Sequence, residues 1–146
     1  MSFLEPEPTP ATAPFWEGVR AGVLRLQRGR TTGRCFFYPR PHSPFDPDEE
    51  VEWFDASGRA TLVSYIINHR PLPDVDVLSP IIALVRLEEG PTLMTNIVDV
   101  EPDPAHLALD MPLQVVFRAA GDAVLPVFTP VFTPTTSGAS AGEVRA

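Results

Sequence analysis

The chain has 146 residues, 44% of them hydrophobic, which is enough for one domain with a single core and excludes wholesale disorder. No apolar run approaches the roughly 20 residues of a membrane span, and the first residues lack the pattern of a secretory signal, so we expect a soluble, cytoplasmic protein. A net charge of −8 disfavours general attraction to nucleic acid, and the single cysteine excludes both a disulfide framework and a zinc site built from several thiolates.

The first elements in chain order are a tail and a short helix. Residues 1–11 carry three prolines among acidic and small residues, a composition that predicts a disordered tail. A helix is predicted to begin after Thr12, which can cap it, and Phe15 and Trp16 belong to its apolar face. Two glycines inside it each cost about 1 kcal/mol relative to alanine. The aromatic face must therefore pack on its own domain or dock a partner.

The next segment combines a strand-like stretch with a loop. The pattern turns strand-like at residues 23–26, and a glycine-containing turn leads to an aromatic run at residues 35–38. Four prolines between residues 39 and 47 forbid helix and central strand alike. We therefore expect residues 39–50 to form a loop.

The remainder is predicted to be a series of short strands separated by turn signals. The strands are expected at residues 51–54, 60–68, 80–88, 91–98, 113–118 and 124–128. Residues 99–110 are expected to hold one helical turn, and a small Greek-key barrel interrupted in this way is the layout of an OB-fold. The barrel is assigned to residues 51–128, and residues 129–146 are predicted to be a mobile tail.

Six of the eleven basic residues, all of them arginine, fall between positions 20 and 40. They are interleaved with an aromatic run, so the group suits stacking and phosphate contact with nucleic acid, bidentate binding of coenzyme A phosphates, or an acidic protein surface. It can equally consist of surface arginines paired with the acidic run at residues 46–55. The candidates for contact with a phosphate or an acyl-CoA are Arg28, Arg30, Arg34, Arg40, His69 and Arg70.

The order of short segments over residues 12–128 resembles a known family. The matching pieces include residues 14–18 (PFWEG), 39–41 (PRP), 51–53 (VEW), 56–59 (ASGR), 69–71 (HRP) and 111–117 (MPLQVVF). They are similar to the zinc-ribbon plus OB-fold proteins encoded beside thiolase-like and lipid-transfer-type enzymes of acyl-CoA metabolism. The resemblance implies a mainly β protein: a five-stranded OB barrel preceded by a short helix and a rubredoxin-like ribbon, the last two at residues 12–50.

The chain departs from this family at the metal. Members usually carry two Cys-x-x-Cys knuckles, and the corresponding positions here are Gly29 and Thr32, then Ser43 and Asp46. All four ligands are missing, so we predict a degenerate ribbon without zinc. Structural zinc is worth about 10 kcal/mol or more in small finger peptides. Burial of aromatic side chains, at roughly 1.5–3 kcal/mol each, is expected to offset part of its loss.

The resemblance implies a non-catalytic accessory or scaffold subunit in a hetero-oligomer with a thiolase-like or lipid-transfer-type enzyme of lipid, sterol or polyketide metabolism. No cofactor is expected, although a coenzyme A thioester can be bound jointly with the partner. The predicted partner-binding residues are Phe15, Trp16, Arg20, Phe36, Phe37 and Tyr38. The alternative is a single-stranded nucleic-acid-binding OB-fold protein. No catalytic residue is predicted, because Cys35 lacks a recognisable base and no acid-base pair stands out.

Overall fold

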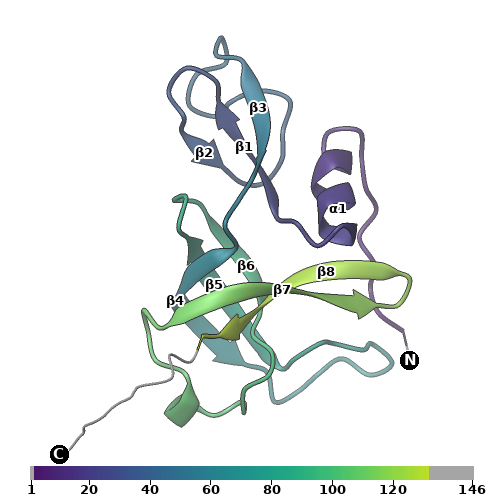
Figure 1. Ribbon diagram of the computed structural model, residues 1–146. Helices are drawn as coiled ribbons and strands as arrows, with labels where there is room; N and C mark the ends of the chain where they lie inside the picture. Colours follow the sequence, from purple (N-terminus) through teal and green to yellow (C-terminus); the bar gives the residue numbers. More distant parts are fainter. Residues whose placement is uncertain (1, 132–146) are drawn as a thin grey trace, which may run out of the picture.

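The computed structural model describes residues 2–131 and contains one α-helix, two antiparallel sheets and a short 3₁₀ turn (Figure 1). The helix is α1 (Ala13–Arg20), and the three-stranded sheet, in the order β2-β1-β3, contains β1 (Arg25–Gly29), β2 (Cys35–Phe36) and β3 (Val51–Asp55). The five-stranded sheet, in the order β6-β5-β4-β7-β8, contains β4 (Arg59–Ile67), β5 (Ile81–Leu87), β6 (Thr92–Asn96), β7 (Pro112–Ala120) and β8 (Ala123–Pro130). The 3₁₀ turn η1 is Pro104–His106.

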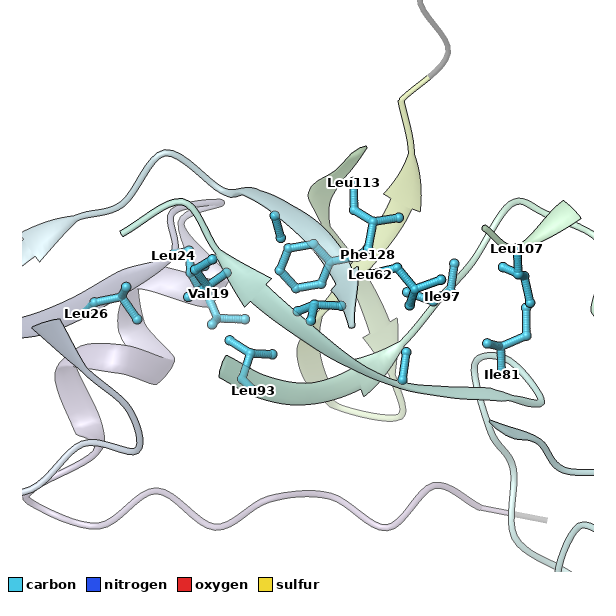
Figure 2. Close-up of a cluster of buried hydrophobic side chains, with 14 of the residues drawn as sticks. Val19, Leu24, Leu26, Leu62, Ile81, Leu93, Ile97, Leu107, Leu113 and Phe128 are labelled. Atoms are coloured by element: carbon cyan, nitrogen blue, oxygen red, sulfur yellow. The ribbon is translucent and has the colours of Figure 1, made fainter. Parts of the chain in front are cut away.

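The five-stranded sheet curls into a nearly closed barrel. Its two outer strands meet at one end, where Ile97 forms a parallel bridge with Phe128 and the Val98 N–H donates to the Phe128 carbonyl at 2.9 Å. The Phe128 side chain is fully buried and lies among the apolar residues of the neighbouring strands in Figure 2. Alternation along β5 buries every second residue against this cluster. The predicted mainly β class and the five-stranded barrel are confirmed.

Helix α1 packs closely on the chain that follows it. A Cβ atom at Gly18 would lie 2.9 Å from both the Val23 carbonyl oxygen and the Arg25 Cγ, so glycine permits this approach. Phe15 and Val19 of the helix are buried in the main core. Tertiary contact therefore stabilises a helix that Gly18 weakens. Gly22, predicted inside the helix, lies beyond its end at Arg20, with a φ of +80°. Thr12 occupies the N-cap position, but its hydroxyl interacts with Thr9 and caps no helical amide, contrary to prediction.

Strand β3 connects the two sheets. The sequence groups residues 51–54 with the barrel strands, whereas β3 pairs along its whole length with β1 in the three-stranded sheet. The chain then turns at residues 56–58 and enters the barrel as β4. The division of the chain at residue 51 stays a prediction.

Residues near the start of the described chain contact two segments that are distant in sequence. Near the start, Ser2 bridges to Val75, and the Glu5 carboxylate accepts a hydrogen bond from the Asp122 N–H at 3.1 Å. The predicted disorder of residues 1–11 stays a prediction. The tail predicted at residues 129–146 lies outside the described residues from position 132 onward. No helix in the described part of the chain is long and apolar enough to cross a membrane.

Candidate partner-binding site

Four aromatic side chains meet where α1 approaches the barrel. The Phe15 ring lies edge-to-face on Trp16, with centroids 4.9 Å apart, and its centroid is 5.4 Å from Phe37 and 6.2 Å from Tyr38. Phe15 is 2% exposed whereas Tyr38 is 43% exposed. The cluster therefore joins the helix to the segment after β2 and presents one large ring to solvent.

A hollow of about 260 Å³ separates this aromatic cluster from the two outer strands of the barrel. Residues 93–96 of β6 and 125–127 of β8 form its far wall. The Trp16 indole Nε1 is buried without a hydrogen-bond partner among the described residues. On the rim, the Met94 side chain is 74% exposed. An aromatic wall with an exposed methionine beside it is the composition that protein interfaces favour.

The remaining two predicted partner-binding residues do not belong to the cluster. Phe36 is buried and packs edge-to-face on Phe45, at 6.4 Å between centroids. Arg20 is exposed at the end of α1 and lines a small hollow with Trp16. The structure thus brings four of the six residues into one cluster and uses Phe36 as core.

Two of the predicted phosphate-contact arginines are paired within the chain. The Arg28 guanidinium donates to the Glu52 carboxylate at 2.8 Å and lies 4.4 Å from the Phe54 ring centroid. Arg30 lies 3.5 Å from the Glu50 carboxylate. These pairs follow from the register of β1 and β3, which sets a basic strand beside an acidic one. They leave less free positive charge than the sequence alone indicates.

The other arginines of the group make different contacts. The Arg34 guanidinium lies 3.5 Å from the Phe45 ring centroid, a cation–π geometry. The Arg40 Nε donates to the Tyr38 carbonyl at 3.4 Å, and its backbone N–H donates to the Gln27 side chain at 2.8 Å. Neither guanidinium forms an ion pair with a described residue.

The structure does not bring His69 and Arg70 to this group. Both follow the end of β4, in the loop at residues 68–80. That loop extends from the end of the barrel that is remote from the three-stranded sheet, beside the N-terminal segment (Figure 1). The six residues predicted to contact a phosphate therefore form at least two separate sets.

The thiol of Cys35 has the wrong electrostatic surroundings for a nucleophile. Burial raises the pKa of Cys35, the carboxylate of Glu89 raises it further, and Arg28 opposes them less strongly. A raised pKa keeps the sulfur protonated, whereas a reactive cysteine needs the thiolate. Among residues 2–131, no three His, Cys, Asp or Glu side chains gather in a way that would hold a metal ion.

Known proteins share this architecture. A family model described as the C-terminal OB-fold domain of ChsH2 matches residues 53–118. The chain is 33% identical over 90 residues to a DUF35 domain-containing scaffold protein of Pyrococcus furiosus, covering 61% of this chain and 66% of that protein. A solved structure described as the Ltp2-ChsH2(DUF35) aldolase matches with a TM-score of 0.76 and 28% identity, over 86% of this chain and 98% of the other. The chain belongs to the DUF35/ChsH2 family.

A longer relative shares only part of its length with this chain. It is 32% identical over 129 residues to the 3-oxo-4,17-pregnadiene-20-carboxyl-CoA hydratase alpha subunit of Mycobacterium tuberculosis. The match covers 88% of this chain but only 40% of that subunit. The chain thus spans less than half the length of this hydratase subunit, and the predicted resemblance to acyl-CoA-associated proteins is confirmed at the level of the family.

Hydrogen bonds close the two turns where the DUF35/ChsH2 resemblance places the zinc knuckles. The Glu49 carboxylate accepts from the Thr31 N–H at 2.9 Å, the Thr32 N–H at 2.6 Å and the Thr32 hydroxyl at 3.2 Å. A Cβ at Gly29 would overlap this carboxylate. In the second turn, the Ser43 hydroxyl accepts from the Phe45 N–H at 3.1 Å.

Glu49 is the structural residue that sequence reasoning missed. It sits in an acidic run whose other members suggest an exposed, solvated face. The hydrogen bonds from the Thr32 backbone hold the pKa of Glu49 below its usual value, and those from Thr31 and the Thr32 hydroxyl act in the same direction. The one hint in the sequence is the glycine at position 29, which admits the carboxylate.

Proposed function

We propose that this chain is a non-catalytic accessory subunit that binds a thiolase-like or lipid-transfer-type enzyme acting on coenzyme A thioesters. The observation that carries the proposal is the match over 98% of a chain in the Ltp2-ChsH2(DUF35) aldolase, at 28% identity. The hydratase alpha subunit named for a carboxyl-CoA substrate and the DUF35 scaffold protein support the same context.

The surface chemistry supports binding of a protein more than binding of a nucleic acid. Two of the clustered arginines are paired with Glu50 and Glu52, and the chain as a whole carries a charge of −8. The aromatic cluster, by contrast, is a packed platform with the exposed Tyr38 and Met94 at its rim. Large rings anchored in a core supply contact area at low entropic cost.

The experiment is co-expression with a thiolase-like protein, followed by size-exclusion chromatography with light scattering. One peak containing both chains is expected. Two separate peaks at micromolar concentration would argue against the proposal. A labelled single-stranded oligonucleotide at low salt serves as the second probe, and we expect no binding.

A matched pair of variants tests the aromatic platform itself. Tyr38 and Phe45 are aromatic residues of the same lobe with nearly equal exposure, 43% and 45%, but only Tyr38 borders the hollow beside α1. Tyr38→Ala is expected to weaken the complex by about tenfold, since truncating an interface anchor costs more than about 1 kcal/mol. Phe45→Ala is expected to bind like the parent. Equal weakening by both would indicate a general effect on the lobe.

A further inference from the structure

The two outer strands of the barrel differ in how they are protected. Strand β8 contains Pro126 and Pro130, which cannot donate backbone hydrogen bonds, and the hollow at its start is bordered by Pro6 and Pro8 of the N-terminal segment. Strand β6, with the sequence Thr-Leu-Met-Thr-Asn, contains neither proline nor charge. An edge strand without such protection offers a template for another strand.

The register of β6 defines which of its backbone groups are free to pair. The Ile97 N–H donates to the Ile81 carbonyl, and the Leu87 N–H donates to the Pro91 carbonyl. Because hydrogen-bonded pairs alternate along an antiparallel ladder, the backbone groups of Thr92 and Met94 point away from β5. The links from β6 to β8 lie further along, at Thr95 and Ile97. The first half of the β6 edge thus faces no other strand in the described structure.

Two apolar hollows flank this edge, and residues 94–96 line both of them. One is the 260 Å³ hollow against the aromatic cluster, and the other, of about 360 Å³, is bordered by Val77, Pro80 and Ile82. Successive side chains of a strand point to opposite faces. A strand laid along β6 would therefore direct its side chains alternately toward one hollow and the other, which is how added strands acquire specificity.

The charged side chains beside the β6 edge indicate which type of residue a bound segment should carry there. Arg86 lies opposite Thr92 in the ladder, is exposed, and has no carboxylate within 4.0 Å among the described residues. A third hollow beside the edge is lined by Arg86, Arg34 and Glu89. The Glu89 carboxylate accepts a hydrogen bond from the Ser57 N–H. In a chain with a net charge of −8, this local basic spot complements an acidic side chain.

We propose that the open part of the β6 edge, residues 92–94, is the docking site for an extended segment of the partner enzyme, which adds to the barrel as a further strand. The segment has apolar side chains at successive positions beside Met94, one directed toward each hollow, and an acidic residue next to Arg86. This inference rests on the proposed function, because it names the surface through which the accessory subunit binds.

The experiment measures the affinity of the co-expressed thiolase-like protein for edge variants. Met94→Pro removes an N–H that points away from β5 and leaves the β5 ladder intact, while Met94→Lys keeps that N–H and removes the apolar side chain. Each is expected to raise Kd about tenfold or more. Leu109→Lys is the matched control, since Leu109 is 63% exposed in the turn before β7, and its Kd should equal that of the parent. Arg86→Glu is expected to weaken binding and to reduce its salt dependence.

Hydrogen exchange of the parent complex supplies an independent readout. The Thr92 and Met94 amides are expected to exchange more slowly in the complex than in the free chain. If the parent binds the partner while the Met94 variants bind equally well and these amides are unprotected, the edge inference is overturned and the proposed function stands. If the parent fails to bind at all, the proposed function fails with it. A homodimer of the free chain that Met94→Lys dissociates would identify a second copy as the occupant and would overturn the inference.

Discussion

Removing the ring of Phe15 tests whether the packing of the aromatic cluster stabilises α1 on the rest of the molecule. Phe15 is 2% exposed and contacts three other aromatic rings, with the Phe37 centroid at 5.4 Å. A buried phenylalanine replaced by alanine typically costs about 3–5 kcal/mol. Since small domains are stable by only about 5–15 kcal/mol, the Phe15→Ala variant should remain folded but unfold at much lower urea concentration.

The part of this loss that belongs to the contact with Phe37 is measured by a double-mutant cycle. The coupling between Phe15→Ala and Phe37→Ala should be about 0.5–1.5 kcal/mol, the range for aromatic pairs beyond their buried area. Urea titrations followed by tryptophan fluorescence give each free energy of unfolding. The control is Phe45→Ala, whose half-exposed ring should cost less than Phe15. A Phe15→Ala loss no greater than that of Phe45→Ala, or a coupling near zero, would refute the reasoning.

Three further predictions concern the ribbon and the barrel. Gly58 has a φ of +79°, and a Cβ there would overlap Val115, so Gly58→Ala should lower the free energy of unfolding by about 1–3 kcal/mol in urea melts. The pKa of Glu49 is lowered chiefly by the Thr32 N–H, so its stabilisation is present above the unfolded pKa, near 4.5, and is lost as the pH falls through the folded value. Glu49→Gln should therefore reduce the fall of Tm as the pH drops below the unfolded pKa, and a Tm difference from the parent that stays constant through that acid range would contradict this role. Metal analysis of the purified protein should find no stoichiometric zinc.

Much of the fold could be predicted because it depends on local pattern. Alternation in β5 and the turns around it mark the barrel strands, and the predicted strands at residues 60–68, 80–88 and 91–98 correspond to β4, β5 and β6. The helical turn expected between residues 99 and 110 is observed as η1. The barrel could be inferred for the same reason, since several short strands with one buried face have few ways to pair.

The candidate site was only partly accessible to such reasoning. Phe15 and Trp16 stand on an apolar helical stripe, and Phe37 and Tyr38 in an aromatic run, so each is recognisable as a contact residue. That these segments meet is decided by the packing of α1 on residues 23–25, which depends on the space at Gly18. No local pattern in the sequence records this approach.

The sequence by itself determined the mainly β class, the family and the absence of four knuckle cysteines, because composition, periodicity and residue identity are local properties. Only the tertiary structure decided where charge and edges lie. The register of β1 against β3 pairs Arg28 with Glu52, and a carboxylate seventeen positions away from Thr32 closes the turn where the family places a metal. The β6 edge is likewise open because β6 and β8 do not pair along their length, and the barrel closes only after β6, where Ile97 bridges to Phe128. Such features arise from contacts between segments that are distant in sequence. The energies of these contacts depend on both segments together, so no local pattern predicts them.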